Sequence, residues 1–173
     1  VTLIAVVLTA CLFTFAQSTS AQEQSISTLS AHSNCRNVQG NMLEVSNSSG
    51  TTGRISNGGI LNGRTQLFYT SGVLATPDPT TVSYTTDFSV TTHRGVLKTH
   101  NAGVFDFATQ VFSEIARIDP NTSTGRFAGA TGVLFTSGKT TDGGATFRSK
   151  ISGEVCLAHR GYHDEDEADD DNE

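Results

Sequence analysis

Alternation of apolar and polar residues with a period of two is the feature that most constrains this sequence. In residues 82–91 the even positions are Val, Tyr, Thr, Phe and Val, whereas the odd positions are Ser, Thr, Asp, Ser and Thr. Successive side chains of a β-strand point to opposite faces, so this pattern predicts a strand with one drier face. Residues 145–157 predict a second such strand. Further strands are predicted at residues 38–46, 65–74, 95–100, 103–108, 111–116 and 127–136.

Turn-forming residues lie between these segments, and helical periodicity is scarce from residue 38 onward. Glycine, asparagine and proline either tolerate a positive φ or fix a turn, so such sequences separate strands. Roughly eight strands at short spacing, with no helix long enough for a parallel crossover, favour a barrel or a sandwich. The turn sequences are Asn57-Gly58-Gly59, Asn62-Gly63, Asp119-Pro120-Asn121 and Asp142-Gly143-Gly144.

The first residues are typical of a secretory signal peptide. Residues 3–16 are mostly apolar but too short to span a bilayer comfortably, and small residues follow up to Ala21. We therefore expect a signal peptide over residues 1–21 and a secreted or periplasmic protein, with Ala16 as a second cleavage position. One alternative is a lipoprotein anchored at Cys11, because the residues before it resemble a lipobox; another is a buried N-terminal helix. The apolar run continues beyond Cys11, which favours the ordinary signal peptide.

The charge of the chain is concentrated at its end. The net charge is −6, yet residues 164–173 contain 8 of the 17 acidic residues, which leaves 9 acids against 11 Lys and Arg upstream. A body of this charge gives no reason to expect nucleic-acid binding. We interpret residues 159–173 as a disordered, solvated acidic tail, with weak capture of divalent cations as the alternative. Residues 22–34 are polar and irregular and predict a flexible lead-in. The sequence contains no spacing that predicts a metal site.

Removal of the leader would leave two cysteines, Cys35 and Cys156, and an even pair in an exported protein favours a disulfide. Cys35 precedes the first predicted strand and Cys156 lies at the end of the last. A disulfide therefore requires the two ends of the folded domain to be neighbours, as in an up-and-down barrel with an even number of strands. The alternative is two free thiols. We predict an all-β domain over residues 35–158, an eight-stranded antiparallel up-and-down barrel.

One segment resembles a known family. Residues 124–132, TGRFAGATG, are similar to a glycine-rich hairpin of bacterial proteins with the allene oxide cyclase barrel-like, dirigent-like fold. Independently of the family, its glycines permit tight turning or close backbone approach, and Phe127 can anchor one side. The resemblance covers residues 36–157 and is concentrated in residues 95–136. The order of the surrounding segments is also similar: residues 95–99, 105–107 and 112–118 before the hairpin, and a last strand after it.

The resemblance implies a barrel with an interior cavity and no metal or organic cofactor. In the family's plant cyclases the cavity directs cyclisation of a fatty-acid epoxide, and in dirigent proteins it orients the coupling of phenoxy radicals. The cyclases place a glutamate in the first strand, two residues before an asparagine that holds a water. Here Glu44 and Ser46 occupy those positions and are the candidate catalytic residues. Assembly of the plant relatives into trimers or larger oligomers implies a homo-oligomer.

Strand residues that point into the barrel are the other candidate site residues. A carboxyl group in an apolar cavity has a raised pKa and can act as a proton donor. Glu44, Asp87, Asp106 and Glu114 all lie within predicted strands, although each could instead face solvent on the outside of the barrel.

Ligand contacts are expected on the drier face of residues 82–91, where Tyr84 and Phe88 lie, and at Glu114. Three functions remain open: binding of an apolar small molecule in the barrel, a cyclase or isomerase that acts on a lipid-like or phenolic substrate, and a structural or interaction module with a filled barrel. The chain has no G-x-S-x-G elbow, P-loop or dinucleotide fingerprint, so hydrolase and nucleotide chemistry have no support.

Overall fold

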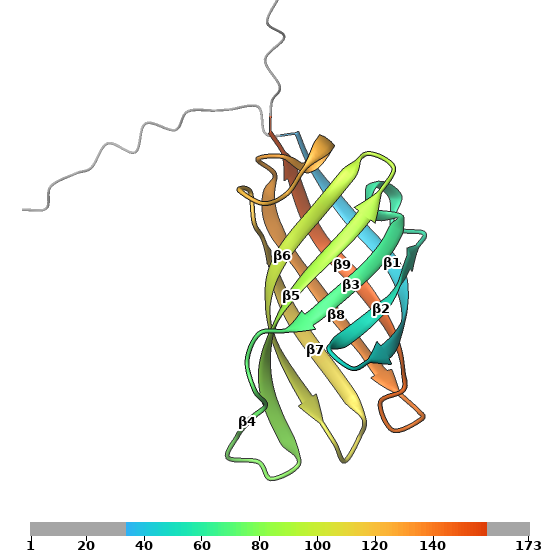
Figure 1. The fold of residues 1–173 in the computed structure, drawn as a ribbon, viewed down its shortest axis with the longest axis vertical. Coiled ribbons are helices and arrows are strands. Elements are labelled where there is room, and N and C mark those ends of the chain that lie inside the picture. The colour runs from blue at the N-terminus through green and yellow to red at the C-terminus, as the bar shows by residue number, and fades with distance from the viewer. Residues whose placement is uncertain (1–33, 159–173) are drawn as a thin grey trace, which may run out of the picture.

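The computed structural model describes residues 34–158, and these form a single antiparallel sheet of nine strands (Figure 1). The leader, the alternative anchor at Cys11, nearly all of the lead-in and the acidic tail lie outside the described residues. The strands are β1 (Asn34–Asn47), β2 (Gly50–Ser56), β3 (Gly63–Tyr69), β4 (Leu74–Ala75), β5 (Thr81–Thr92), β6 (Gly95–Asp106), β7 (Val111–Ile118), β8 (Thr131–Thr140) and β9 (Thr146–Leu157). Two short 3₁₀ segments, η1 (Gly59–Leu61) and η2 (Gly125–Phe127), lie in connections.

Eight of these strands close into a ring. The order around the sheet is β3-β2-β1-β9-β8-β7-β6-β5, and β5 also pairs with β3, which completes the circle. Every pairing is antiparallel, and β4 pairs only with β5, outside the ring (Figure 1). The predicted eight-stranded up-and-down barrel is thus confirmed, with one short strand added outside it.

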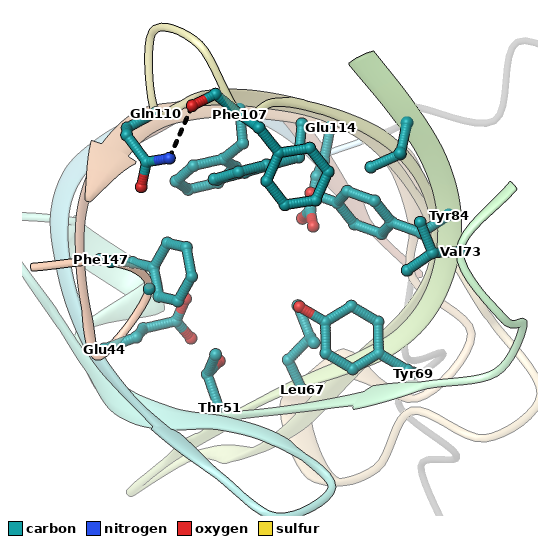
Figure 2. A pocket seen from close by; sticks show the side chains of 15 residues that line it. Glu44, Thr51, Leu67, Tyr69, Val73, Tyr84, Phe107, Gln110, Glu114 and Phe147 are labelled. Atoms are coloured by element: carbon teal, nitrogen blue, oxygen red, sulfur yellow. Dashed lines mark hydrogen bonds between the residues drawn. The ribbon is translucent and has the colours of Figure 1, made fainter. Parts of the chain in front are cut away.

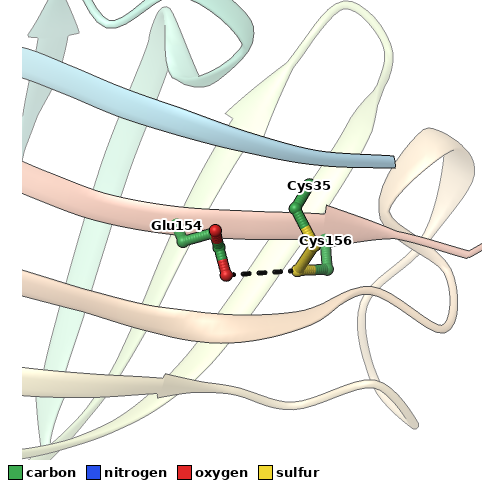
Figure 3. Close-up of a disulfide and its surroundings, with 3 residues drawn as sticks. All are labelled: Cys35, Glu154 and Cys156. Carbon is green, nitrogen blue, oxygen red and sulfur yellow. Dashed lines mark hydrogen bonds between the residues drawn. A yellow bond between two sulfur atoms is a disulfide. The ribbon is translucent and has the colours of Figure 1, made fainter. Parts of the chain in front are cut away.

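The first and last strands of the ring are joined covalently. β1 and β9 pair over twelve positions, and Cys35 lies opposite Cys156 in that register. A disulfide joins the two residues, as predicted (Figure 3). Glu154 Oε1 lies 3.5 Å from the Cys156 sulfur. These three residues do not form a metal site, because the two sulfurs are bonded to each other.

The strand count matches the prediction through two compensating differences. β2 was not predicted, because its inward positions are Thr51, Gly53 and Ile55, and a single large apolar residue gives no clear alternation. Conversely, the predicted strands 95–100 and 103–108 form one continuous strand, β6. The two residues between them, Asn101 and Ala102, pair with β5 and β7 in an unbroken ladder, although asparagine is typical of turns.

The glycine-rich segment that resembles the family hairpin forms the connection between the paired strands β7 and β8. The predicted strand 127–136 begins only at Thr131, because η2 and the loop after it precede it. Phe127 in η2 is 0% exposed and so anchors this connection to the core, as expected. Gly125 has a φ of 59°, and a Cβ there would lie 2.4 Å from the Arg94 carbonyl oxygen. A larger residue would therefore clash with that carbonyl group.

The barrel interior is packed at one end only. A cluster of buried apolar side chains occupies the half of the barrel near the disulfide between β1 and β9. Leu61 of η1 and Phe127 of η2 belong to this cluster. The cluster consists of Val38, Met42, Ile55, Leu61, Leu67, Phe88, Val90, Leu97, Ala116, Ile118, Phe127, Ala130, Leu134, Ile151, Val155 and Leu157. This packed half leaves the other half of the interior to a different set of residues.

The outside of the barrel carries some exposed apolar residues, including Val104, Ile115 and Phe135 on the adjacent strands β6, β7 and β8. The expected homo-oligomer stays a prediction. In the part of the chain that the structure describes, no helix has the length and apolar character needed to cross a membrane.

Removal of the disulfide should destabilise the barrel strongly, because the bridge spans 121 residues of sequence. For a loop of this length, the loss of constraint on the unfolded chain corresponds to roughly 4–5 kcal/mol. We expect the double variant Cys35→Ser/Cys156→Ser to show this decrease in the free energy of unfolding, measured by denaturant titration. The reduced wild-type protein serves as the matched control and should behave like the double variant. An unchanged denaturation midpoint would contradict the role assigned to the bridge.

Candidate functional site

The half of the barrel opposite the packed core encloses a cavity of about 400 Å³ (Figure 2). Residues from the connections after β3, β6 and β8 contribute to its wall, so it lies at the end of the barrel where these connections are found. Its lining residues are Glu44, Thr51, Leu67, Tyr69, Val73, Val82, Tyr84, Phe105, Phe107, Gln110, Phe112, Glu114, Gly143, Gly144 and Phe147.

Aromatic side chains make up much of the wall. They form three edge-to-face pairs, an arrangement that aromatic rings prefer because of their quadrupoles. The ring centroids are 5.7 Å apart in Tyr69–Tyr84, 5.0 Å in Phe105–Phe107 and 5.6 Å in Phe112–Phe147. The rings therefore support one another around an open space instead of filling it.

Glu44 is an inward residue of β1 and is only 3% exposed. Burial removes water from its carboxyl group and raises the pKa to about 7. A hydrogen bond from the Thr65 hydroxyl to Glu44 Oε1, 2.9 Å long, acts in the opposite direction, and the nearby charge of Glu114 raises the pKa further. The Thr51 hydroxyl lies close enough to favour the ionised form slightly, but it makes no hydrogen bond of ordinary geometry.

Glu114 on β7 is the second buried acid of the cavity, at 8% exposure. Burial raises its pKa, whereas hydrogen bonds from Tyr84 and Asn101 lower it. Asn101 Nδ2 donates to Glu114 Oε2 at 3.1 Å, and the Thr99 hydroxyl in turn donates to Asn101 Oδ1 at 2.6 Å. Together these side chains present Glu114 with donors, which is the arrangement that an ionised carboxylate requires.

Tyr84 reaches Glu114 because a glycine lies beneath its ring. Gly103 is the β6 residue paired with Tyr84, and a Cβ at that position would lie 2.6 Å from the Tyr84 Cζ atom. Burial, followed by the charge of Glu114, raises the pKa of Tyr84, so the phenol stays neutral and remains a donor. The glycine at position 103 is therefore what allows this donor to lie flat against the wall.

Three buried hydroxyl groups lack a hydrogen-bond partner among the described residues: those of Thr51, Thr86 and Ser149. Buried polar groups are rarely left unpaired, so such groups call for an explanation. Thr51 is 5% exposed and lines the cavity beside Glu44 (Figure 2). Its hydroxyl is thus a polar group available to a molecule that occupies the cavity.

The structure separates the predicted site residues into three locations. Glu44, Tyr84 and Glu114 line the cavity together. Phe88 does not line the cavity, because it lies four residues after Tyr84 on β5, within the packed core. Ser46 is exposed at the rim, where its hydroxyl donates to the Gly144 carbonyl oxygen, and it does not line the cavity either.

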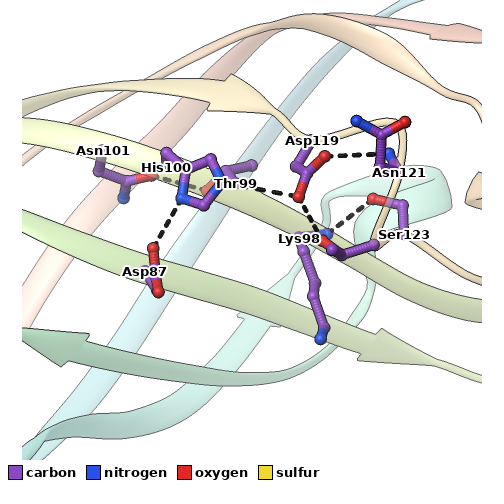
Figure 4. A network of polar contacts seen from close by, with 9 residues as sticks. Asp87, Lys98, Thr99, His100, Asn101, Asp119, Asn121 and Ser123 are labelled. Carbon is purple, nitrogen blue, oxygen red and sulfur yellow. Dashed lines mark hydrogen bonds and ion pairs between the residues drawn. The ribbon is translucent and has the colours of Figure 1, made fainter. Parts of the chain in front are cut away.

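The remaining strand acids are outside the cavity. Asp106 accepts hydrogen bonds from the Ala108 amide and the Thr109 hydroxyl in the β6–β7 turn. Asp87 lies 2.7 Å from His100 Nδ1 on the outer surface, and this contact raises the pKa of the exposed imidazole (Figure 4). The second His100 nitrogen lies 3.6 Å from Asp119. This network links the outer faces of β5 and β6 to the loop after β7.

Several lining residues were not predicted. Phe147 shares its parity with Ile151 and Val155, so alternation alone could have assigned it to the interior. Phe105 was not assigned to the interior because the prediction divided β6 near Asn101. The alternation of the first half of the strand could then not be continued to Phe105. Thr51 had no usable signal, because β2 lacks a clear alternation.

Comparison of the chain with protein-family models, with curated proteins and with solved structures finds no match. The chemistry of the cavity therefore has to be inferred from its geometry.

The raised pKa of Glu44 predicts a loss of stability as the pH rises. Folding increases the affinity of this carboxyl group for its proton, so stability is highest at low pH and declines between the unfolded pKa of 4.5 and the folded pKa of about 7. The decline attributable to Glu44 is about 3 kcal/mol, and Glu114 acts in the same direction. The Glu44→Gln variant should lose this part of the decline, measured as the free energy of unfolding against pH.

The exposed residue Glu154 offers a matched control for that measurement. Glu154→Gln makes the same substitution on the outer surface, away from the cavity, and so reports effects of the substitution that are unrelated to burial in the cavity. The groups that titrate elsewhere, such as His100 and Asp106, are present in all three proteins and cancel in the comparison. Identical profiles for Glu44→Gln and the wild type would show that Glu44 is not buried as described.

Proposed function

We propose that this protein binds a small, mostly apolar molecule inside its barrel, with the apolar part of the ligand against the aromatic wall and a polar part near Glu44 and Glu114. The observation that carries the proposal is the unequal filling of the interior: one half is packed, whereas the other encloses about 400 Å³. Small-molecule sites are typically concave, mostly apolar and roughly 300–1,000 Å³ in volume, with a few converging polar groups.

The volume also weighs against the alternative of a structural module with a filled barrel. Eight strands form a barrel near the size at which side chains alone can fill the interior. Here the aromatic rings stand in pairs along the wall, and the space between them remains open (Figure 2).

We further propose that the protein is a secreted or periplasmic member of the allene oxide cyclase-like, dirigent-like group. The sequence of residues 124–132 and the antiparallel barrel support the relationship, and the disulfide supports an oxidising compartment.

An enzyme of the cyclase or isomerase type is the second candidate, and the pKa of Glu44 favours it. A carboxyl group whose pKa is about 7 can exchange a proton near neutral pH, as a general acid or base requires. Glu44 would then be the proton-transferring group, without a metal or an organic cofactor. Ser46 is less well placed, because its hydroxyl is bonded to the Gly144 carbonyl at the rim. For any substrate found, Glu44→Gln should abolish turnover.

Ligand binding can be tested with a neutral apolar fluorophore such as N-phenyl-1-naphthylamine. We expect one probe to bind per barrel, with enhanced fluorescence. Val82→Trp should abolish binding, because Val82 lines the cavity and a larger ring would occupy it.

Val104→Trp provides the matched control, since Val104 is exposed on the outside of β6, next to the partner of Val82. This variant should bind the probe like the wild type. Equal probe binding by both variants would place the probe on the surface and refute the proposal.

A further inference from the structure

We propose that the ligand of this cavity is an organic cation, a molecule with an ammonium group attached to an apolar body. This inference rests on the proposed function and specifies its ligand class. The ammonium group would lie between Glu44 and Glu114, and the apolar body would lie among the aromatic rings nearer the mouth (Figure 2).

The first argument is an imbalance of charge. Two buried carboxyl groups face the cavity, and none of its fifteen lining residues is Lys, Arg or His. In the described residues, the ion pairs that the structure shows are those of His100 with Asp87 and Asp119, on the outer surface. A buried carboxylate is costly unless an opposite charge accompanies it. The partner of these two groups must therefore be either protons or a cation from outside the chain.

The second argument is the direction of the hydrogen bonds. Thr65 donates to Glu44, and Asn101 donates to Glu114 while Thr99 orients the Asn101 amide. Tyr84 adds a further hydrogen bond to Glu114. The two carboxyl groups thus act as hydrogen-bond acceptors from these protein donors. A site built from acceptors is complementary to a ligand that brings donors or positive charge.

The third argument comes from the wall. Tyr69, Tyr84, Phe105, Phe107, Phe112 and Phe147 line the cavity. The face of an aromatic ring is electronegative and attracts ammonium groups, most strongly where water is excluded. The Thr51 hydroxyl, buried beside Glu44 without a partner of ordinary geometry, is a further acceptor for the ligand.

A metal ion fits the site less well. Calcium and magnesium take six or more oxygen ligands at short distances. Among the described residues, neither Glu44 nor Glu114 belongs to a group of three potential metal-ligating side chains, and most of the other lining residues are aromatic or aliphatic. An organic cation needs no such coordination shell.

The inference can be tested with two probes of the same shape. Benzyltrimethylammonium is a cation, and neopentylbenzene is its neutral counterpart, with carbon in place of nitrogen. Displacement of N-phenyl-1-naphthylamine from the full-length protein measures both. We expect the cation to bind about 30-fold more tightly than the neutral compound, because a buried charge pair contributes at this level.

The acids are tested separately. Glu44→Gln and Glu114→Gln should each reduce affinity for the cation by about 30-fold while leaving neopentylbenzene affinity nearly unchanged, since only the charge is removed. Glu154→Gln, on the outer surface, should change neither affinity. Retained binding of the neutral compound shows that the two cavity variants are folded.

The affinity for the cation should also rise as the pH increases through the Glu44 pKa of about 7, because this carboxyl group must lose its proton to attract the cation, and the raised pKa of Glu114 acts in the same direction. The titratable groups that line the cavity are Glu44 on β1, Tyr69 on β3, Tyr84 on β5 and Glu114 on β7. Burial raises the pKa of both tyrosines, so they stay neutral over this range. The quaternary ammonium probe does not titrate, which assigns any change to the acids.

The possible results distinguish the two proposals. Equal affinities for the two probes, or cation affinity unchanged by both glutamine substitutions, would refute the proposal of a cationic ligand. Either result would leave the proposal of small-molecule binding intact. Displacement of the fluorophore by calcium or magnesium chloride, but not by benzyltrimethylammonium, would overturn it in favour of a metal. Failure of the fluorophore and both probes to bind would refute the proposed function itself.

Discussion

The pairing of β1 with β9 is the constraint on which the rest of this structure depends. It joins the first and last long strands of the sheet and so converts an open meander into a closed ring of eight strands, with β4 alone outside it. The Cys35–Cys156 disulfide ties together two residues that are already opposite in this register. A slip of one residue in β1 would move Glu44 from the interior to the surface, because strand side chains alternate. The position of the candidate site therefore follows from closure.

The two ends of the barrel are closed to different extents, and this difference creates the cavity. At one end, η1 and η2 insert Leu61 and Phe127 into the core and complete its packing. At the other end, the connection between β8 and β9 contributes only Gly143 and Gly144 to the lining. The apolar residues that the connections after β3 and β6 contribute there, Val73 and Phe107, are exposed and so do not close this end as Leu61 and Phe127 close the other. The barrel thus has a closed base and an open end, and the two buried glutamates lie between them.

Burial of two acids without a protein cation lowers the stability of the barrel at neutral pH. Features that reduce stability in this way are concentrated at functional sites, where local rules of packing are broken for another purpose. The raised pKa of Glu44, the unpartnered hydroxyl of Thr51 and the open volume beside them occur at one place. This coincidence separates the cavity from the outer network of His100, Asp87 and Asp119, whose charged groups pair with one another.

The sequence by itself determined the all-β class, the disulfide and which residues share a strand face, such as Tyr84 and Phe88. It could not identify β2, whose threonines and glycines have no periodicity, and it did not predict that β6 continues through Asn101 and Ala102. Only the tertiary structure decided that Tyr84 borders the cavity while Phe88, four residues later, belongs to the core. Alternation specifies the side of a strand, but height along the barrel depends on the tilt and stagger of all eight strands. The meeting of Glu44 with Glu114, seventy residues apart, has the same origin.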